Sequence, residues 1–264
     1  MLGPDDASAP HDILRRDFEG KVVLVTGASS GIGAAVAKAF GAHGARVVVH
    51  YGHNRSGAEA VAAAIGCDAL VLGADLAIDS AAGELVDAID RRLGGIDVLI
   101  NNAGDPLGRW AFLEADDATI CRILDLNLNA VIRLCRRAVP SIRRRSGGAI
   151  VNTTSIAART GGGPGMVFYA IAKAGVAALT RGLARELATE GIRVNAVSPG
   201  VIETPLHARL SSADHLRKAA ASVPLGRMGT PEECIGAYLC LASPTLGGYL
   251  TGQTIEVNGG LLMP

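Results

Sequence analysis

The amino-acid sequence predicts an α/β fold: a doubly wound, Rossmann-like parallel sheet of seven strands with helices on both faces. Short runs rich in valine and isoleucine alternate along the 264 residues with longer, alanine-rich helical patterns. The short runs are nearly continuously apolar, as expected of strands that are covered on both faces. No proline- or serine-rich linker interrupts the alternation, and helical crossovers between neighbouring strands favour parallel order.

The expected elements follow one another from residue 21 to residue 258. KVVLV forms the first strand, a glycine-rich turn follows it, and an alanine-rich helix comes next. Later strands are the apolar runs that end in small or polar residues, and the helices are the longer segments between them. The expected strands are 21–25, 45–50, 69–73, 96–101, 148–153, 192–197 and 254–258. The expected helices are 31–42, 56–65, 80–93, 116–145, 168–190 and 231–242.

Residues 1–17 are expected to form a loose N-terminal extension, and residues 18–264 a single domain. The extension is acidic, contains proline and lacks the apolar core of a signal peptide. The uncharged run from Cys234 to Ile255 is long enough to span a bilayer. Pro244 and several glycines break it, so a helix, a turn and a strand explain it better, and no membrane partner is expected.

Charge and cysteine content narrow the function classes. Lysine plus arginine and aspartate plus glutamate each number 25, which gives no electrostatic case for binding nucleic acid. The basic run 136–145 is expected to be a solvated helix end. The five cysteines are scattered, and neither they nor the histidines show zinc spacing, so no metal site is expected. Buried free thiols in a reducing cytoplasm fit this pattern.

Residues 26–33, TGASSGIG, lie directly after the first strand and open the first long helix. Small residues let the backbone approach a pyrophosphate, and the helix N-terminus supplies N–H donors. The segment lacks the lysine of a P-loop, which argues against hydrolysis of a nucleoside triphosphate. A tight strand–helix turn without a ligand is the alternative. The expected nucleotide-binding residues here are Gly27, Ser29, Ser30, Gly31, Ile32 and Gly33.

The second strand ends in HYGHNRSG, where folds that select NAD often place an acidic residue for the ribose diol. This segment has none. His50, His53, Asn54 and Arg55 are expected to receive a 2′-phosphate instead, which favours NADP over NAD. Ser30, inside the glycine loop, adds no positive charge, and Arg55 taken alone could be an ordinary exposed cation.

Polar residues also follow the third and fourth strands. Asp75 is expected to accept from an adenine amino group while Leu76 packs on the ring, although a helix N-cap is an equal alternative for Asp75. The segment Asn101–Gly104, NNAG, follows the fourth strand. Asn102, Ala103 and Gly104 permit close contact with a cofactor, and asparagine side chains can brace neighbouring strands. A plain turn is the alternative for this segment.

The segment FYAIAK places Tyr169 four residues before Lys173, so both side chains lie on one helix face. An ammonium beside a phenol favours the phenolate and is expected to lower the pKa of the tyrosine below about 10. Such a group suits proton transfer near neutral pH. A half-buried tyrosine with a snorkelling lysine is the alternative for an isolated motif of this kind.

Taken together, the motifs resemble the single-domain short-chain dehydrogenase/reductase family. TGASSGIG, NNAG, Asn127 in LDLNLNAV, Ser155 in IVNTTS, Tyr169 with Lys173, and PGVIET at 199–204 occur in the order of that family. The resemblance covers about residues 18–262. It implies a seven-stranded parallel sheet, NADP or NAD as cofactor, and a homo-oligomer, usually a tetramer or dimer.

The resemblance also implies the roles of the site residues. Tyr169 would be the general acid in carbonyl reduction and the base in alcohol oxidation, while Lys173 would lower its pKa and hold the nicotinamide ribose. Ser155 would hydrogen-bond the substrate oxygen, and Asn127 would help to hold a proton-relaying water. Further contacts to the cofactor would come from Pro199, Gly200, Ile202 and Thr204.

The expected function is therefore hydride transfer between a nicotinamide cofactor and a carbonyl or secondary alcohol, with a 3-oxoacyl group as one reasonable substrate. A protein that senses NAD(P)H without turnover, and an epimerase or dehydratase on the same fold, are the alternatives. Specificity is expected in 105–113, in the loop after Ser155, and in 205–226, which has the pattern of a mobile lid. Residues there that could contact substrate, or be ordinary surface residues, are Arg109, Trp110, Arg159, His207 and Arg209.

Overall fold

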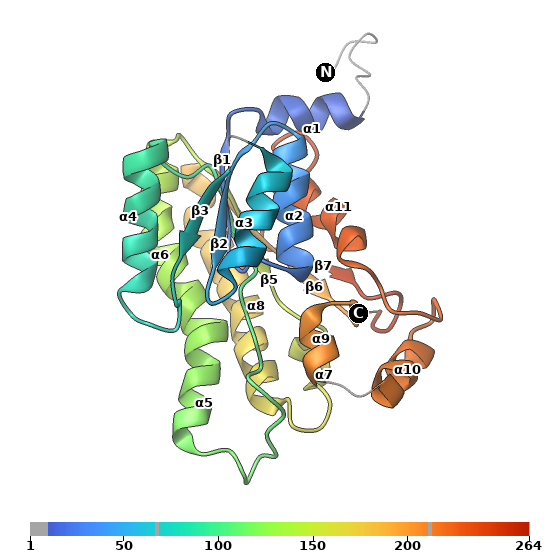
Figure 1. The fold of residues 1–264 in the computed structure, drawn as a ribbon. Coiled ribbons are helices and arrows are strands. Elements are labelled where there is room, and N and C mark those ends of the chain that lie inside the picture. The colour runs from blue at the N-terminus through green and yellow to red at the C-terminus, as the bar shows by residue number, and fades with distance from the viewer. Residues whose placement is uncertain (1–9, 67–68, 211–212, 264) are drawn as a thin grey trace.

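A parallel seven-stranded sheet forms the centre of the computed structural model, which describes residues 10–66, 69–210 and 213–263 (Figure 1). The strand order is β3-β2-β1-β4-β5-β6-β7, and every pairing is parallel. All seven expected strands are confirmed, and no strand end differs by more than two residues. The strands are β1 (Val22–Val25), β2 (Arg46–Tyr51), β3 (Leu70–Gly73), β4 (Val98–Asn101), β5 (Gly148–Thr153), β6 (Ile192–Pro199) and β7 (Thr254–Val257).

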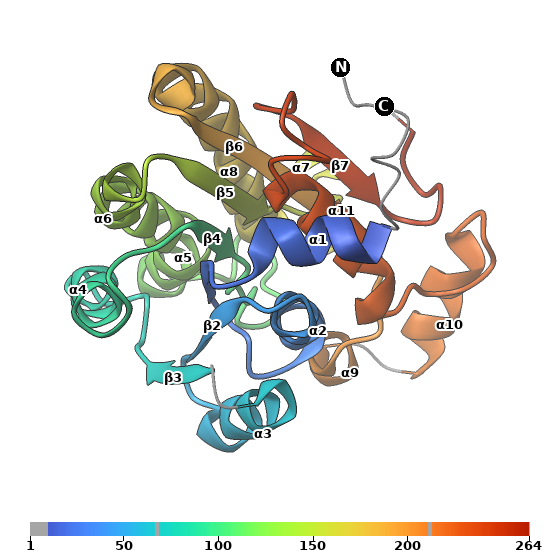
Figure 2. The same cartoon turned by 90° about the horizontal axis from the view of Figure 1, so that it is seen from above.

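Helices cover both faces of this sheet, as Figure 2 shows from above. Successive side chains of a strand point to opposite faces, so Val23 and Val25 of β1 enter one apolar core while Val22 and Leu24 enter the other. The first core includes residues of α2 (Gly31–Ala42), α3 (Arg55–Ile65) and α11 (Pro231–Ala242). The second includes residues of α4 (Ala81–Leu93), α6 (Ala130–Arg144) and α8 (Val167–Leu187).

The helix expected over 116–145 is interrupted. It consists of α5 (Asp117–Leu124), a π-helical segment (Asp125–Asn129) and α6. The extra residue per turn in the middle segment places Asn127 in the interior, fully buried. Beyond β1, the described residues also form α7 (Ala157–Thr160), a 3-10 turn (Ala188–Glu190), α9 (Pro205–Leu210) and α10 (Ala213–Ser222).

Part of the expected N-terminal extension is ordered differently from the prediction. Residues 10–17, expected to be loose, belong to helix α1 (Pro10–Phe18), while residues 1–9 lie outside the described part of the chain. Phe18 packs edge-on against Phe40, with the ring centroids 4.9 Å apart. The buried carboxylate of Asp17 accepts hydrogen bonds from Ser243 and from the hydroxyl of Thr245, the latter at 2.8 Å. These contacts fasten α1 to the segment after α11.

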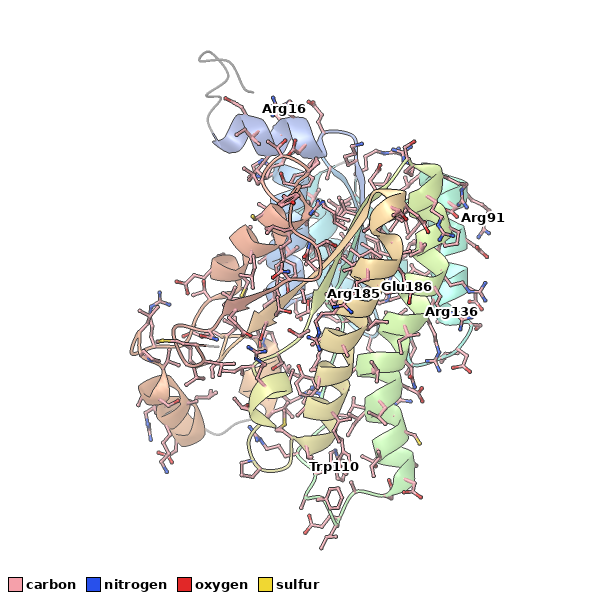
Figure 3. The ribbon with its side chains drawn as sticks, turned by 180° about the vertical axis from the view of Figure 1, so that it is seen from behind. Arg16, Arg91, Trp110, Arg136, Arg185 and Glu186 are labelled. Atoms are coloured by element: carbon pink, nitrogen blue, oxygen red, sulfur yellow. The ribbon has the colours of Figure 1, made fainter. Side chains whose placement is uncertain are left out.

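The basic run at the end of α6 is largely paired. Arg143, Arg144 and Arg145 form ion pairs with Glu190, Asp90 and Asp97 respectively, while Arg136 lies on the outer side of α6 (Figure 3). The pairing agrees with a helix end at the protein surface.

The structure also shows which of the described cysteines are buried and how the two long apolar segments fold. Cys135 and Cys234 are buried, but Cys121 is exposed, so the expected burial of every thiol is wrong there. The run 234–255 forms the predicted helix, turn and strand. Residues 167–190 would suffice for a membrane span by length and composition alone. This segment begins with α8, which packs against β5 and β6 of the sheet.

Candidate functional site

A cavity of about 850 Å³ opens at the carboxyl ends of the central strands. The chain reverses its direction of sheet growth between β1 and β4, which is where doubly wound sheets bind their ligands. The loops after β1, β4, β5 and β6 line the cavity together with the start of α8 and with α9 and α10. The site predicted from separate motifs therefore forms one continuous space.

The glycine-rich loop lines the inner part of this cavity. Gly27, Ser29, Ser30, Gly31, Ile32 and Gly33 all contribute to its wall. Ser30 is the N-cap of α2 but its side chain makes no capping bond, so the first N–H donors of the helix are left for a ligand. A Cβ at Gly33 would come 2.4 Å from the carbonyl oxygen of Gly27, so only glycine allows α2 to start this close to the loop.

One hydroxyl side chain and one amide side chain fix the glycine-rich loop against the end of the neighbouring strand. The Thr26 hydroxyl accepts from the backbone N–H groups of Asn102 and Ala103, at 2.9 and 3.0 Å. The Asn102 amide donates to the carbonyl oxygens of Thr26 and Gly27. Asn102, Ala103 and Gly104 line the cavity, and Asn102 also has the bracing role predicted for asparagine here. Thr26 was missed, although it opens the motif.

His50 corrects an expectation. It does not face a 2′-phosphate: the ring is buried, Nδ1 accepts from the N–H of Gly27 at 3.2 Å, and Nε2 lies 3.0 Å from the carbonyl oxygen of Ala74. Burial lowers the pKa of this imidazole to about 4, so it is neutral at pH 7. A neutral ring with Nε2 protonated satisfies both contacts, which ties the glycine-rich loop to the ends of β2 and β3.

The other residues expected around the adenosine end lie outside the cavity wall. Asn54 caps α3 by accepting from Gly57 at 3.0 Å, and exposed Arg55 pairs with Glu59 at 2.8 Å. His53 is exposed. Asp75 accepts from Ala77 and pairs with Arg122 at 3.6 Å, and Leu76 is buried in the second core. Contacts of these five residues with a cofactor stay predictions.

Tyr169, Lys173 and Ser155 line the same cavity as the glycine-rich loop. The ammonium of Lys173 lies 5.6 Å from the ring centroid of Tyr169 and donates to the carbonyl oxygen of Thr153 at 2.8 Å. The hydroxyl of Ser155 favours ionisation of the Tyr169 phenol by lowering its pKa. The helical spacing of the tyrosine and lysine thus places both against the end of β5.

The protonation states differ from the expectation. Burial raises the pKa of Tyr169 to about 12, although the Ser155 hydroxyl opposes the rise, and the charge of Asp105 adds to it. Burial lowers the pKa of Lys173 to about 8. The expected depression of the tyrosine pKa is wrong for the protein alone, because desolvation of the phenol outweighs the opposing effect of Ser155. At pH 7 the phenol holds its proton.

Asn127 stands behind these groups and does not line the cavity. Its side-chain oxygen accepts from Asp105 N–H at 2.9 Å, and its amide nitrogen donates to the carbonyl oxygens of Asp105 and Ile123. A Cβ at Gly104 would lie 2.8 Å from the Asn127 oxygen and 3.1 Å from Lys173 Nζ. Glycine is therefore required at 104 to let these two side chains pack together.

The outer wall comes from the segments after β6. Pro199, Gly200, Ile202 and Thr204 line the cavity, as predicted. Arg109, Arg209 and apolar residues of α9 and α10 also line the cavity. Trp110 and Arg159 are absent from this wall; Trp110 lies near the tip beyond the start of α8 (Figure 3). The side chain of His207 lies outside the described residues.

A nicotinamide dinucleotide fits these observations. A turn with free helix N–H donors suits its pyrophosphate, and a phenol, an ammonium and several glycines line the same space. The chemistry of the lining therefore agrees with the cofactor that the sequence predicts.

Comparison with known proteins identifies the family. A family model described as Enoyl-(Acyl carrier protein) reductase matches residues 27–262. A 3-oxoacyl-[acyl-carrier-protein] reductase of Synechocystis is 40% identical, over 92% of this chain and 97% of the relative. A 3beta-hydroxysteroid dehydrogenase 1 of Eggerthella lenta is 38% identical, over 94% and 95%.

Among solved structures, a protein of Brucella melitensis described as a short-chain dehydrogenase/reductase and glucose/ribitol dehydrogenase superposes with a TM-score of 0.86. It is 36% identical, and the match covers 94% of this chain and 99% of that one. The chain therefore belongs to the short-chain dehydrogenase/reductase family of nicotinamide-dependent oxidoreductases.

Proposed function

We propose that this protein reduces a ketone to a secondary alcohol with a nicotinamide cofactor, and that Tyr169 donates the proton. The observation that carries the proposal is the shared cavity, in which the glycine-rich loop and the Ser155–Tyr169–Lys173 group face one space. The cofactor supplies the hydride, and the protein positions and polarises the substrate.

The acid/base roles follow from the protonation states. Tyr169, with a pKa near 12, keeps its proton at neutral pH and can give it to a developing alkoxide. Ser155 donates to the same substrate oxygen as negative charge builds up. Lys173, with a pKa near 8, remains mostly charged at pH 7 and holds the ribose hydroxyls.

Asn127 contributes by position. Because its side chain is committed to Asp105 and Ile123, we assign it to holding the loop after β4 beside Lys173. The pyrophosphate would lie on residues 27–33, and the nicotinamide end on Ala103, Gly104 and the 199–204 segment.

The substrate we propose is a 3-oxoacyl thioester. Support comes from the relatives named as 3-oxoacyl-[acyl-carrier-protein] reductases, which are 36–40% identical over nearly the whole chain. The lid side of the cavity offers an apolar wall for an acyl chain: Met166, Leu206, Leu210 and Leu216 all line it. Related finer proposals are NADP as the preferred cofactor, a homo-oligomer of two or four chains, and a place in the cytoplasm.

The test is oxidation of NADPH and NADH by the purified protein across a panel of 3-oxoacyl thioesters, hydroxysteroid ketones and simple ketones. We expect turnover with at least one 3-oxoacyl thioester. Nucleotide binding with no turnover on any ketone would support a sensor instead. Product formed without net cofactor oxidation would support an epimerase or dehydratase.

A further inference from the structure

Asp105, the residue that follows NNAG, uses its two carboxylate oxygens for two different purposes. Oδ1 accepts from the N–H of Leu107 at 2.7 Å, and Oδ2 pairs with the guanidinium of Arg209. Leu107 has a positive φ of 57°, so the first contact fixes a turn that a leucine seldom adopts. The second contact reaches a residue 104 positions later in the chain.

The backbone of Asp105 is held as firmly as its side chain. Its N–H and its carbonyl oxygen both bond to the side chain of Asn127, at 2.9 and 2.7 Å. The carboxylate therefore has a fixed place on the wall of the cavity that Tyr169 also lines, and its charge opposes ionisation of the phenol. Among the described residues that line the cavity, Asp105 is the one acidic side chain.

Arg209 belongs to α9, the first helix of the segment that covers the apolar wall of the cavity. Its side chain is 60% exposed, whereas that of Asp105 is 22% exposed. A pair this accessible adds little to stability, which suits a contact that opens and closes. A second contact also joins the loop after β4 to α9. Arg109 donates to the carbonyl oxygen of Leu210 at 3.3 Å, and to that of Pro164 at 3.1 Å.

We propose that Asp105 is a positioning residue that couples closure of the α9–α10 lid to the acid/base group. With the lid closed, Arg209 neutralises Asp105; with the lid open, the carboxylate stands uncompensated in the cavity that Tyr169 also lines. The lid thus changes the charge that the phenol experiences as well as the access of solvent. This inference rests on the proposed function.

The charge balance gives the direction of the effect. The groups that act on the Tyr169 hydroxyl or face it are Lys173 on its own helix, Ser155 after β5, Asp105 after β4 and Tyr238 of α11. Only Asp105 carries negative charge at neutral pH. Pairing with Arg209 reduces its influence, so a closed lid makes the phenolate easier to form.

The first test is the pH profile of alcohol oxidation, in which Tyr169 must lose its proton. Asp105→Asn keeps an oxygen for Leu107 but removes the charge, and we expect the acidic limb to move down by about half a pH unit. Arg209→Gln should move it up, and Arg209→Lys should restore it. In the Asp105→Asn background, Arg209→Gln should have no further effect.

Arg217→Gln is the matched control, because Arg217 lies on α10 and pairs with Asp214 at 3.2 Å, away from the cavity wall. The coupling would be overturned if the acidic limb of the pH profile did not move in Asp105→Asn. It would also be overturned if Arg209→Gln shifted that limb equally in the wild-type and Asp105→Asn backgrounds. Lack of ketone reduction by the wild-type protein across the whole panel would instead overturn the proposed function.

The second test needs no turnover. Hydrogen exchange of α9 amides in the protein alone should be faster in both Asp105→Asn and Arg209→Gln than in the wild type, and no faster in the double variant. Arg217→Gln should leave α9 unchanged. If the α9 amides of Asp105→Asn exchanged at the wild-type rate, the carboxylate would not hold the lid in place. The inference would then be wrong whether or not the protein reduces ketones.

Discussion

At the scale of single residues, burial decides the protonation states that sequence spacing leaves open. The four-residue separation of Tyr169 and Lys173 correctly predicts that the two side chains share a helix face. It does not predict that the lysine bonds to Thr153 and that desolvation raises the pKa of the phenol to about 12. Burial depends on contacts between α8 and distant strands, which no local motif contains.

Arg55 provides a test of cofactor preference at this scale. Its pair with Glu59 is exposed to solvent and therefore weak, so a 2′-phosphate could compete for the guanidinium. We expect Arg55→Gln to raise the Kd for NADPH about tenfold, the size of one charge-assisted hydrogen bond, and to leave the Kd for NADH unchanged. Glu59→Gln should lower the Kd for NADPH. Both constants can be measured by fluorescence titration.

Arg15→Gln is the control for this measurement. Arg15 and Glu19 form a similar exposed pair, four residues apart, at the opposite end of the sheet on and after α1. If Arg55→Gln weakens the binding of NADPH and NADH equally, or weakens neither, the 2′-phosphate does not bind at Arg55.

At the scale of elements, the order and register of strands follow from apolar runs, but interruptions of helices do not. The sequence predicts all seven strands and most helices. It predicts a single helix over 116–145 because the apolar periodicity continues through it. The π-helical turn forms because Asn127 bonds to Asp105 in a loop after β4, a contact across 22 residues. Helix α1 was missed because its anchors, Ser243 and Thr245, lie far along the chain.

The sequence motif identifies the glycine-rich loop, but the side chains that hold the loop in shape lie outside the glycine positions of that motif. Its glycines and its position after β1 are local signals. The hydroxyl of Thr26 and the imidazole of His50 hold its shape through contacts with β4 and the end of β3. From the sequence alone, a histidine at the end of a strand suggests a ligand-binding residue more readily than a residue that holds a neighbouring loop in place.

The His50 brace predicts a pH dependence of stability. Because the folded pKa of His50, about 4, lies below the unfolded value of 6.5, the unfolded chain binds more protons between these values. Stability is therefore present above pH 6.5 and is lost as pH falls toward 4. The expected loss from this group is about 2 kcal/mol between pH 7 and pH 5.

Urea unfolding at pH 7 and pH 5 measures this difference. His50→Asn keeps an acceptor for Gly27 but does not titrate, so its stability should fall by about 2 kcal/mol less over the interval. His53→Asn replaces an exposed histidine on the same turn and should behave like the wild type. Equal losses in His50→Asn and the wild type would show that the ring is already charged or solvated.

At the scale of the whole molecule, an apolar surface remains at the tip of α5 and α8. Phe112 is 67% and Leu113 is 92% exposed. Phe112 stacks on Phe168 with centroids 5.7 Å apart, and Ile171 lies one helical turn further along, 51% exposed. A second copy of the chain would cover them.

The assembly can be measured by sedimentation. We expect the wild-type protein to sediment as a dimer or tetramer, and Leu113→Glu with Ile171→Glu to shift it toward a smaller species. Leu225→Glu is the control, because Leu225 is similarly exposed, at 69%, beyond the lid helix α10. A monomeric wild type would refute the proposed oligomer, and unchanged sedimentation of the double variant would place the interface elsewhere.

The most direct test of the whole account is pre-steady-state ketone reduction by Tyr169→Phe, followed through the fluorescence of bound NADPH. Removal of the hydroxyl deletes the proton donor and keeps the ring, so we expect a loss of about 10²- to 10⁴-fold in turnover with nearly unchanged Kd for the nucleotide. Tyr249→Phe, at a fully exposed tyrosine, should match the wild type. Turnover by Tyr169→Phe within a factor of about two of the wild type would contradict the account, because another group would then have to supply the proton.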